Sequence, residues 1–109
     1  MKSCRVYWRD RQNIEHGVYV EAENRYHAFG LTMHAMRKCS WCNPDYHDVQ
    51  RMTVEVLNGR RQRLIVTRDE FESWLGPPTL SGDKTREYLL MLLGRMVPDR
   101  DFKRHRSQR

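Results

Sequence analysis

The residues best suited to metal chemistry lie in one short stretch of the sequence. Cys39 and Cys42 are separated by two residues, and His34 and His47 flank them in the pattern H-x4-C-x2-C-x4-H. Thiolates and imidazoles are the ligands that zinc takes in tetrahedral structural sites. A single C-x-x-C pair without a second one is a weak indication of such a site, however. We therefore expect two reduced cysteines, no bound metal and no other cofactor.

Redox or hydrolytic catalysis is not favoured by the same region. A redox-active pair needs its first cysteine at a helix N-terminus, where the dipole lowers the thiol pKa. Cys39 instead follows the predicted C-terminal end of a helix. His27 and His34 project from one side of that helix, but no nucleophile or carboxylate pattern accompanies them. The sequence also lacks a phosphate-binding glycine loop, a nucleophile elbow and an H-E-x-x-H helix. We expect a protein that is not an enzyme.

Basic side chains form the largest group that could bind a partner. The chain has 20 Lys and Arg against 14 Asp and Glu, a net charge of +6, and the basic excess is greatest over residues 95–109. The side chains predicted to contact nucleic acid or an acidic partner are Arg9, Arg11, Arg60, Arg61, Arg63, Lys103, Arg104 and Arg106. Specific readout also needs an element that enters a groove or aromatic side chains that stack on bases. The sequence contains no helix-turn-helix and no strand motif of the RNA-recognition type.

The apolar run at residues 88–93 is the second candidate for binding. Consecutive residues of a helix point about 100° apart, so one flat contact cannot cover all six side chains. We expect one side of this helix to pack on the domain through Leu89, Leu92, Leu93 and Met96. The predicted partner interface is then Leu90, Met91 and Val97, which would contact another protein or a second copy of the chain in a homodimer.

Apolar and polar residues alternate in four segments, which predicts the strands that carry these side chains. The segments are residues 4–9, 18–22, 52–56 and 63–66. Three helices are predicted from their capping residues: one after Asn24, one after the capping box of Thr67 and Glu70, and one from Asp83 to about Met96. Residues 39–50 are expected to form a loop. The order β-β-α-β-β-α-α predicts an α+β domain, an antiparallel sheet of about four strands with helices packed on one face.

Two glycines have predicted structural roles. Gly30 interrupts the apolar stripe of the first helix and is expected where that helix lies close to the sheet. Gly59 is expected in a three-residue hairpin loop with a left-handed backbone, which would pair Val56 with Arg60. A two-residue loop would mix apolar and charged side chains on one face, because a slip of one residue moves every side chain to the opposite face.

Length and composition fit one small domain. The chain has 109 residues, of which 39% are hydrophobic, and its longest apolar run is far shorter than the roughly 20 residues of a spanning helix. The N-terminus lacks an apolar signal stretch, and three cysteines argue against a disulfide framework. We expect a cytoplasmic protein, with an α+β domain over residues 1–97 and a basic, flexible tail over residues 98–109.

These features favour a small regulator or inhibitor that acts by binding a larger protein or a nucleoprotein complex. Accessory proteins of phages and mobile elements, including anti-CRISPR proteins, are often of this size and equally poor in motifs. This is a general analogy that no particular residue of the chain establishes. The net basic charge suits an acidic or nucleic-acid-bearing surface and excludes a mimic of DNA. The alternative is a nucleic-acid-binding module that uses the arginine hairpin and the tail.

Overall fold

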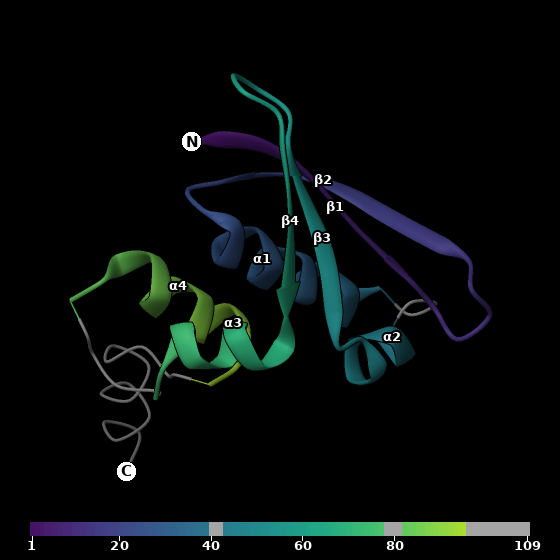
Figure 1. Cartoon of the computed structure of the whole chain (residues 1–109). Coiled ribbons are helices and arrows are strands. Elements are labelled where there is room, and N and C mark those ends of the chain that lie inside the picture. Colours follow the sequence, from purple (N-terminus) through teal and green to yellow (C-terminus); the bar gives the residue numbers. More distant parts are fainter. Residues whose placement is uncertain (40–42, 78–81, 96–109) are drawn as a thin grey trace, which may run out of the picture.

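Two antiparallel hairpins form the sheet of this protein. In the computed structural model, which describes residues 1–39, 43–77 and 82–95, β1 (Lys2–Arg9) pairs with β2 (Glu15–Ala22), and β3 (Arg51–Val56) pairs with β4 (Gln62–Thr67). β1 also pairs antiparallel with β3, which gives one four-stranded sheet in the order β2-β1-β3-β4 (Figure 1). The predicted α+β class with an antiparallel sheet is confirmed.

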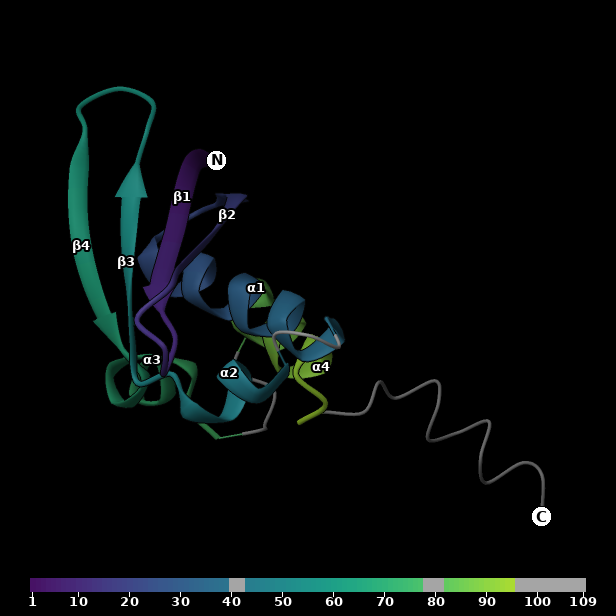
Figure 2. The same ribbon diagram turned by 90° about the vertical axis from the view of Figure 1, so that its right-hand side faces the viewer.

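Four helices accompany the sheet: α1 (Arg25–Lys38), α2 (Asn43–Asp48), α3 (Arg68–Leu75) and α4 (Lys84–Leu92). α1 packs against all four strands, and α4 packs on α1 and α3 instead of on the sheet. Figure 2 shows this arrangement edge-on, with the sheet on one side of α1 and α4 on the other. Helix α2 corrects the prediction of a loop over residues 39–50. Pro44 falls in its first turn, where a missing backbone N–H removes no helical hydrogen bond.

The core lies between the sheet and α1. The buried side chains of the strands come from the alternate positions that face α1: Cys4, Val6, Trp8, Ala22, Met52, Val54, Val56 and Val66. They meet Phe29, Met33 and Met36 of α1, and Phe71 of α3 packs on Phe29 with ring centroids 4.9 Å apart. Full burial of each such side chain stabilises the fold by about 1.5–3 kcal/mol. The apolar stripe that the sequence predicts on α1 consists of Tyr26, Phe29, Met33 and Met36; the last three are core residues, and Tyr26 is half-buried.

The predicted helix caps are confirmed. The side chain of Asn24 accepts a hydrogen bond from the backbone N–H of His27 at 2.9 Å. The Thr67 hydroxyl accepts from the N–H of Glu70 at 3.1 Å, and the Glu70 carboxylate accepts from the N–H of Thr67 at 3.0 Å. Asp83 caps α4 in the same way through the N–H of Thr85.

Helix α4 ends earlier than predicted. Its last residue is Leu92, and Gly94 follows with a φ of 75°. The N–H of Gly94 donates to the carbonyl of Met91, and the N–H of Arg95 donates to that of Leu90, which is the Schellman pattern of a glycine-terminated helix. The left-handed glycine therefore ends α4 before Pro98 does, and the prediction of a helix to Met96 is wrong.

Gly30 allows close contact between α1 and the helices α3 and α4. It does not lie against the sheet. A Cβ atom at this position would lie 2.9 Å from the Cδ atoms of Leu89 and 3.1 Å from a ring carbon of Phe71. These side chains belong to α4 and α3, so the predicted contact of Gly30 with the sheet is wrong. The absence of a side chain at Gly30 lets Leu89 of α4 pack directly on α1.

The β3–β4 hairpin has a longer loop than predicted. Val56 pairs with Gln62 and Val54 with Leu64, so five residues connect the strands. Gly59 has the expected positive φ of 73°. The loop is longer because β1 holds its first residues: the N–H of Leu57 donates to the carbonyl of Ser3, and the Asn58 side chain accepts from the N–H of Ser3. The shift from the predicted register is two residues, so the same side chains still face the core.

Candidate functional site

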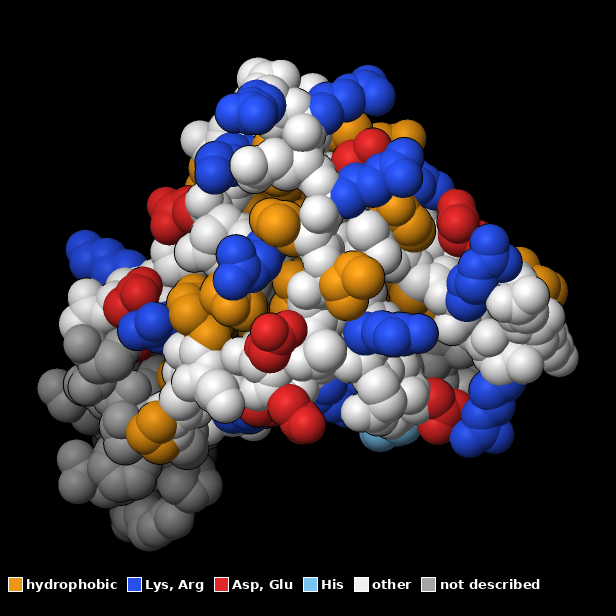
Figure 3. All heavy atoms as spheres, viewed as in Figure 1, with side chains coloured by type: hydrophobic (Ala, Val, Ile, Leu, Met, Phe, Trp, Pro, Cys, Tyr) orange, Lys and Arg blue, Asp and Glu red, His pale blue; other side chains and the backbone are white. Residues whose placement is uncertain are grey.

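One face of the sheet is left uncovered by the described helices. We call it the open face, and its side chains are those that alternate with the core positions: Ser3, Arg5, Tyr7, Arg9, Glu15, Tyr19, Glu21, Arg51, Thr53, Glu55, Arg63, Ile65 and Thr67. Figure 3 shows this side of the molecule, where hydrophobic side chains lie between lysine and arginine side chains. The open face is thus both basic and partly apolar.

An arginine organises the centre of the open face. The Arg5 guanidinium lies 4.4 Å from the ring centroid of Tyr7 and donates a hydrogen bond of 2.9 Å to the carboxylate of Glu15. This hydrogen bond raises the pKa of Arg5 above its ordinary value. The guanidinium also passes over Gly17, where a Cβ atom would lie 3.3 Å from Nη2. The missing side chain at Gly17 therefore leaves the space in which Arg5 reaches Glu15.

Three arginines on or beside the open face have no partner among the described residues. Arg51 begins β3, and Arg60 and Arg61 lie in the hairpin loop, all three exposed and without a described ion pair or hydrogen bond of the side chain. Arg63 is different, because its Nε lies 3.5 Å from the carboxylate of Glu55 on the neighbouring strand. Positive charge is therefore available at both ends of β3.

Apolar side chains lie between these charges. Tyr19 is 74% exposed and Ile65 is 63% exposed, although both belong to regular strands. Tyr7 and Tyr19 occupy diagonal positions on neighbouring strands, because Tyr7 pairs with Gly17 and Arg5 pairs with Tyr19. Exposed aromatic rings with adjacent guanidinium groups are the platform on which proteins stack unpaired bases.

A notch divides the lower part of the open face. β1 and β3 pair only as far as Tyr7 and Thr53, after which each strand continues with its own hairpin partner. Figure 1 shows the two hairpins separating below this point. The gap holds a cavity of about 710 Å³, which we call the notch. Its lining includes Tyr7, Arg9, Asn13, Glu15, Asp48, Gln50, Arg51, Thr53 and Ile65.

Loop contacts hold the rim of the notch in place. The Asp10 carboxylate accepts hydrogen bonds from the backbone N–H groups of Gln12 and Ile14 and lies 2.8 Å from Nε2 of His16. The contact with His16 contributes most to lowering the pKa of Asp10, followed by the backbone bonds. The His16 ring in turn stacks on Trp8. This network fixes the loop that carries Asn13.

The structure places the predicted basic residues in different surroundings. Arg9 lies on the open face at the notch, and Arg60, Arg61 and Arg63 lie at or near the hairpin tip. Arg11 is paired with the carboxylate of Asp48 at 2.9 Å and is less available than predicted. Lys103, Arg104 and Arg106 lie outside the described residues. Arg5 and Arg51, which the sequence pattern did not single out, complete the basic surface.

The predicted interface on α4 needs a correction. Leu90 is 1% exposed and belongs to the core, whereas Met91 is 40% exposed as expected and Val97 lies outside the described residues. α4 packs on both α1 and α3, so two of its sides are covered and not one. This packing buries Leu89 and Leu90 together, although they point about 100° apart. Leu90 is therefore unavailable to a partner.

The residues of the H-x4-C-x2-C-x4-H pattern that the structure describes are not brought together into a site. Nδ1 of His34 lies 3.1 Å from the carbonyl oxygen of Leu92, Cys39 follows α1, and His47 is exposed on α2. Cys42 lies outside the described residues. Within residues 1–39, 43–77 and 82–95, no group of three or more His, Cys, Asp or Glu side chains could hold a metal ion.

Among the helices that the structure describes, none is long and apolar enough to cross a membrane. Comparison of this chain with known protein families, curated proteins and solved structures finds no match.

Proposed function

We propose that this protein is a small, non-enzymatic regulator that contacts nucleic acid, free or within a nucleoprotein complex, through its open face. The observation that carries this proposal is the exposed basic and aromatic surface left by one-sided helix packing. Arg51, Arg60 and Arg61 have no described partner, and Tyr19 is 74% exposed beside Arg5.

Charge arrangement supports an anionic partner. Two glutamates of the open face are paired with arginines, Glu15 with Arg5 and Glu55 with Arg63, whereas Glu21, at the far end of β2, accepts a hydrogen bond from the Ser3 hydroxyl. The arginines without partners are therefore the groups that an incoming phosphate would meet. Arginine suits this role because its planar guanidinium forms two parallel hydrogen bonds to a phosphate.

The burial of Leu90 also favours the open face over α4 as the contact surface. The exposed apolar residues of α4 are reduced to Tyr88 and Met91. A regulator that covers nucleic acid with its sheet needs no second surface, because occupying the strand already denies it to other proteins. This is how the proposed binding would inhibit a larger nucleoprotein complex.

Binding of labelled single-stranded and duplex oligonucleotides tests the proposal, with fluorescence anisotropy read over a series of salt concentrations. We expect affinity at physiological salt that falls as salt rises, because binding to phosphates releases counterions. The double variant Arg60→Gln/Arg61→Gln should weaken binding. It should also reduce the slope of log affinity against log salt by about 0.7–0.9 for each phosphate that the protein no longer neutralises.

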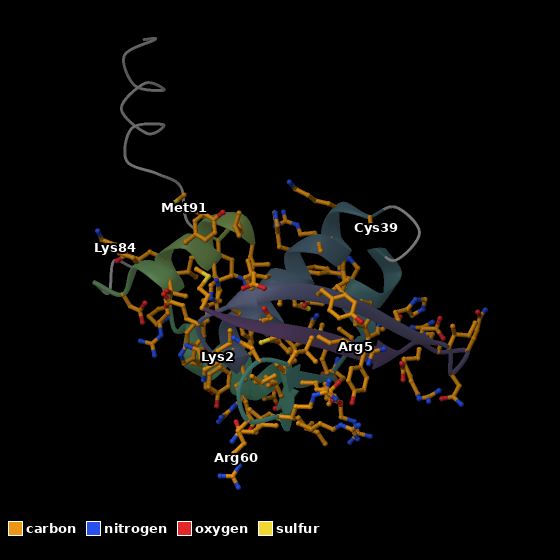
Figure 4. All side chains as sticks on the ribbon, turned by 90° about the horizontal axis from the view of Figure 1, so that it is seen from above. Lys2, Arg5, Cys39, Arg60, Lys84 and Met91 are labelled. Atoms are coloured by element: carbon orange, nitrogen blue, oxygen red, sulfur yellow. The ribbon has the colours of Figure 1, made fainter. Side chains whose placement is uncertain are left out.

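A matched control removes the same charge elsewhere. Lys84 begins α4, and Figure 4 shows it on the side of the molecule away from Arg60. The variant Lys38→Gln/Lys84→Gln should bind almost as wild type, because charges more than about 10 Å away are largely screened. Absence of binding to every oligonucleotide, or equal losses in the two double variants, would contradict the proposed function.

A further inference from the structure

The notch has the size and composition of a ligand site. Its volume of about 710 Å³ lies within the roughly 300–1,000 Å³ that is usual for pockets holding small molecules. It opens where the pairing of β1 and β3 stops after Tyr7 and Thr53, while the pairing within each hairpin continues to Arg9 with Glu15 and to Arg51 with Thr67. Each wall is therefore a strand that stays hydrogen-bonded to its own hairpin partner, β1 to β2 and β3 to β4.

The charge of the notch is positive once its ion pairs are counted. Two acidic residues line it, but Glu15 is held by Arg5 at 2.9 Å and Asp48 by Arg11 at 2.9 Å. Arg9 and Arg51 line opposite walls. Arg51 has no described partner, and Arg9 donates to the carbonyl of Asn13 at 3.0 Å while lying 3.9 Å from Glu15. The two arginines thus flank the gap with hydrogen-bonding capacity to spare.

The remaining lining is partly apolar. Tyr7 and Ile65 contribute a ring and an exposed aliphatic side chain from the two sides of the gap, with Thr53 between them on β3. Asn13 and Gln50 add amide groups at the rim. A ligand that satisfies this lining has an anionic group, a flat apolar part and polar edges, which are the components of a nucleotide.

Resting on the proposed function, we propose that the notch binds one nucleotide of a single-stranded nucleic acid. The phosphate lies between Arg9 and Arg51, and the base lies against Tyr7 and Ile65. Adjacent nucleotides follow the open face toward Tyr19 and the hairpin tip.

The shape of the open face favours a single strand over a duplex. Four strands spaced about 4.8 Å apart place their outer backbones about 14 Å from each other. The major groove of B-DNA is about 12 Å wide, so the face as a whole cannot enter it. An unpaired strand can instead spread its bases on a sheet and on the aromatic side chains it carries.

The test compares Arg51→Gln with Lys84→Gln in anisotropy titrations of a labelled oligothymidylate and of a duplex. Each variant removes one exposed positive charge, but only Arg51 lines the notch. We expect Arg51→Gln to bind the single strand about tenfold more weakly, because it removes a hydrogen bond between charged groups. Ile65→Asp, which places a carboxylate in the proposed base contact, should also weaken binding, while Lys84→Gln should not.

The outcomes separate this inference from the proposed function. Weaker oligonucleotide binding in Arg60→Gln/Arg61→Gln together with unchanged binding in Arg51→Gln and Ile65→Asp would overturn the notch and leave the proposed function standing. Tighter binding of the duplex than of the single strand would overturn the single-strand assignment in the same way. A wild-type protein that binds neither oligonucleotide overturns both. Melting curves of each variant establish that weaker binding does not come from unfolding.

Discussion

Burial of His27 makes the stability of the protein depend on pH. The side chain is 6% exposed, and its Nδ1 accepts a hydrogen bond of 3.0 Å from the backbone N–H of Glu23, which requires the unprotonated nitrogen. Burial lowers the pKa of His27, and the charge of Glu23 only partly opposes this. Below the ordinary histidine pKa of about 6.5, the unfolded chain therefore gains a proton that the folded chain does not.

We expect the free energy of unfolding to fall as pH drops from about 7 through the unfolded pKa, and to stop falling below the lowered folded pKa. One proton sets a maximum slope of about 1.4 kcal/mol per pH unit. Urea unfolding at a series of pH values measures it. His27→Gln supplies the matched comparison, because glutamine keeps an acceptor but does not titrate. An identical pH dependence in both proteins would contradict the assignment to His27.

At the scale of single residues, strand alternation carries much of the information about the site. Cys4, Val6 and Trp8 are predicted to share the buried face, so the same alternation places Arg5, Tyr7 and Arg9 on the opposite one. What alternation cannot supply is the ion pairing. From the sequence, Arg11 is selected as a contact residue and Arg51 is not, yet Asp48 pairs with Arg11 and leaves Arg51 without a described partner.

Helices α1, α3 and α4 begin where their capping residues predict, whereas the strands begin earlier than predicted and the loop and helix lengths are less predictable. The caps at Asn24, Thr67 and Asp83 depend on side chains that bond within three residues, so sequence is sufficient to locate them. The length of the β3–β4 loop depends instead on Ser3, 55 residues from Asn58 in the sequence. The position of the notch likewise depends on where the pairing of β1 with β3 ends. A local sequence pattern does not predict that point.

The capping box of α3 gives a prediction at this scale. Thr67→Ala removes the hydroxyl that accepts from the N–H of Glu70, and we expect a decrease of about 1 kcal/mol in the free energy of unfolding. For a domain of this size that corresponds to a decrease of roughly 4–8 °C in melting temperature. Ser73→Ala removes an exposed hydroxyl from the middle of the same helix and should be nearly neutral. Equal melting temperatures for the two variants would show that the cap contributes nothing.

At the scale of the whole molecule, the sequence predicts the α+β fold class better than it predicts how many layers the sheet and helices form. The apolar pattern of residues 88–93 predicts a helix on a sheet with one side left over, which assigns Leu90 to a partner. The structure places α4 on α1 and α3, where Gly30 admits Leu89 and a pair of hydrogen bonds at 2.5 and 2.7 Å ties Arg95 to Glu72. That arrangement gives the chain a third layer, and it lets a small protein bury a helix that is apolar on more than one side.

This packing leads to the last prediction, which concerns the oligomeric state. Leu90→Glu would bury a carboxylate among apolar side chains, so we expect it to lower the free energy of unfolding by more than about 3 kcal/mol. Met91→Glu, one residue away but 40% exposed, should change it by less than about 0.5 kcal/mol. Tyr88 and Met91 are the exposed large hydrophobic residues of α4, too few for the roughly 1,200 Å² that stable interfaces bury, so we expect no dimer formed through this helix in sedimentation experiments. A concentration-dependent dimer that Leu90→Glu converts into a folded monomer would contradict this packing and restore Leu90 to an interface.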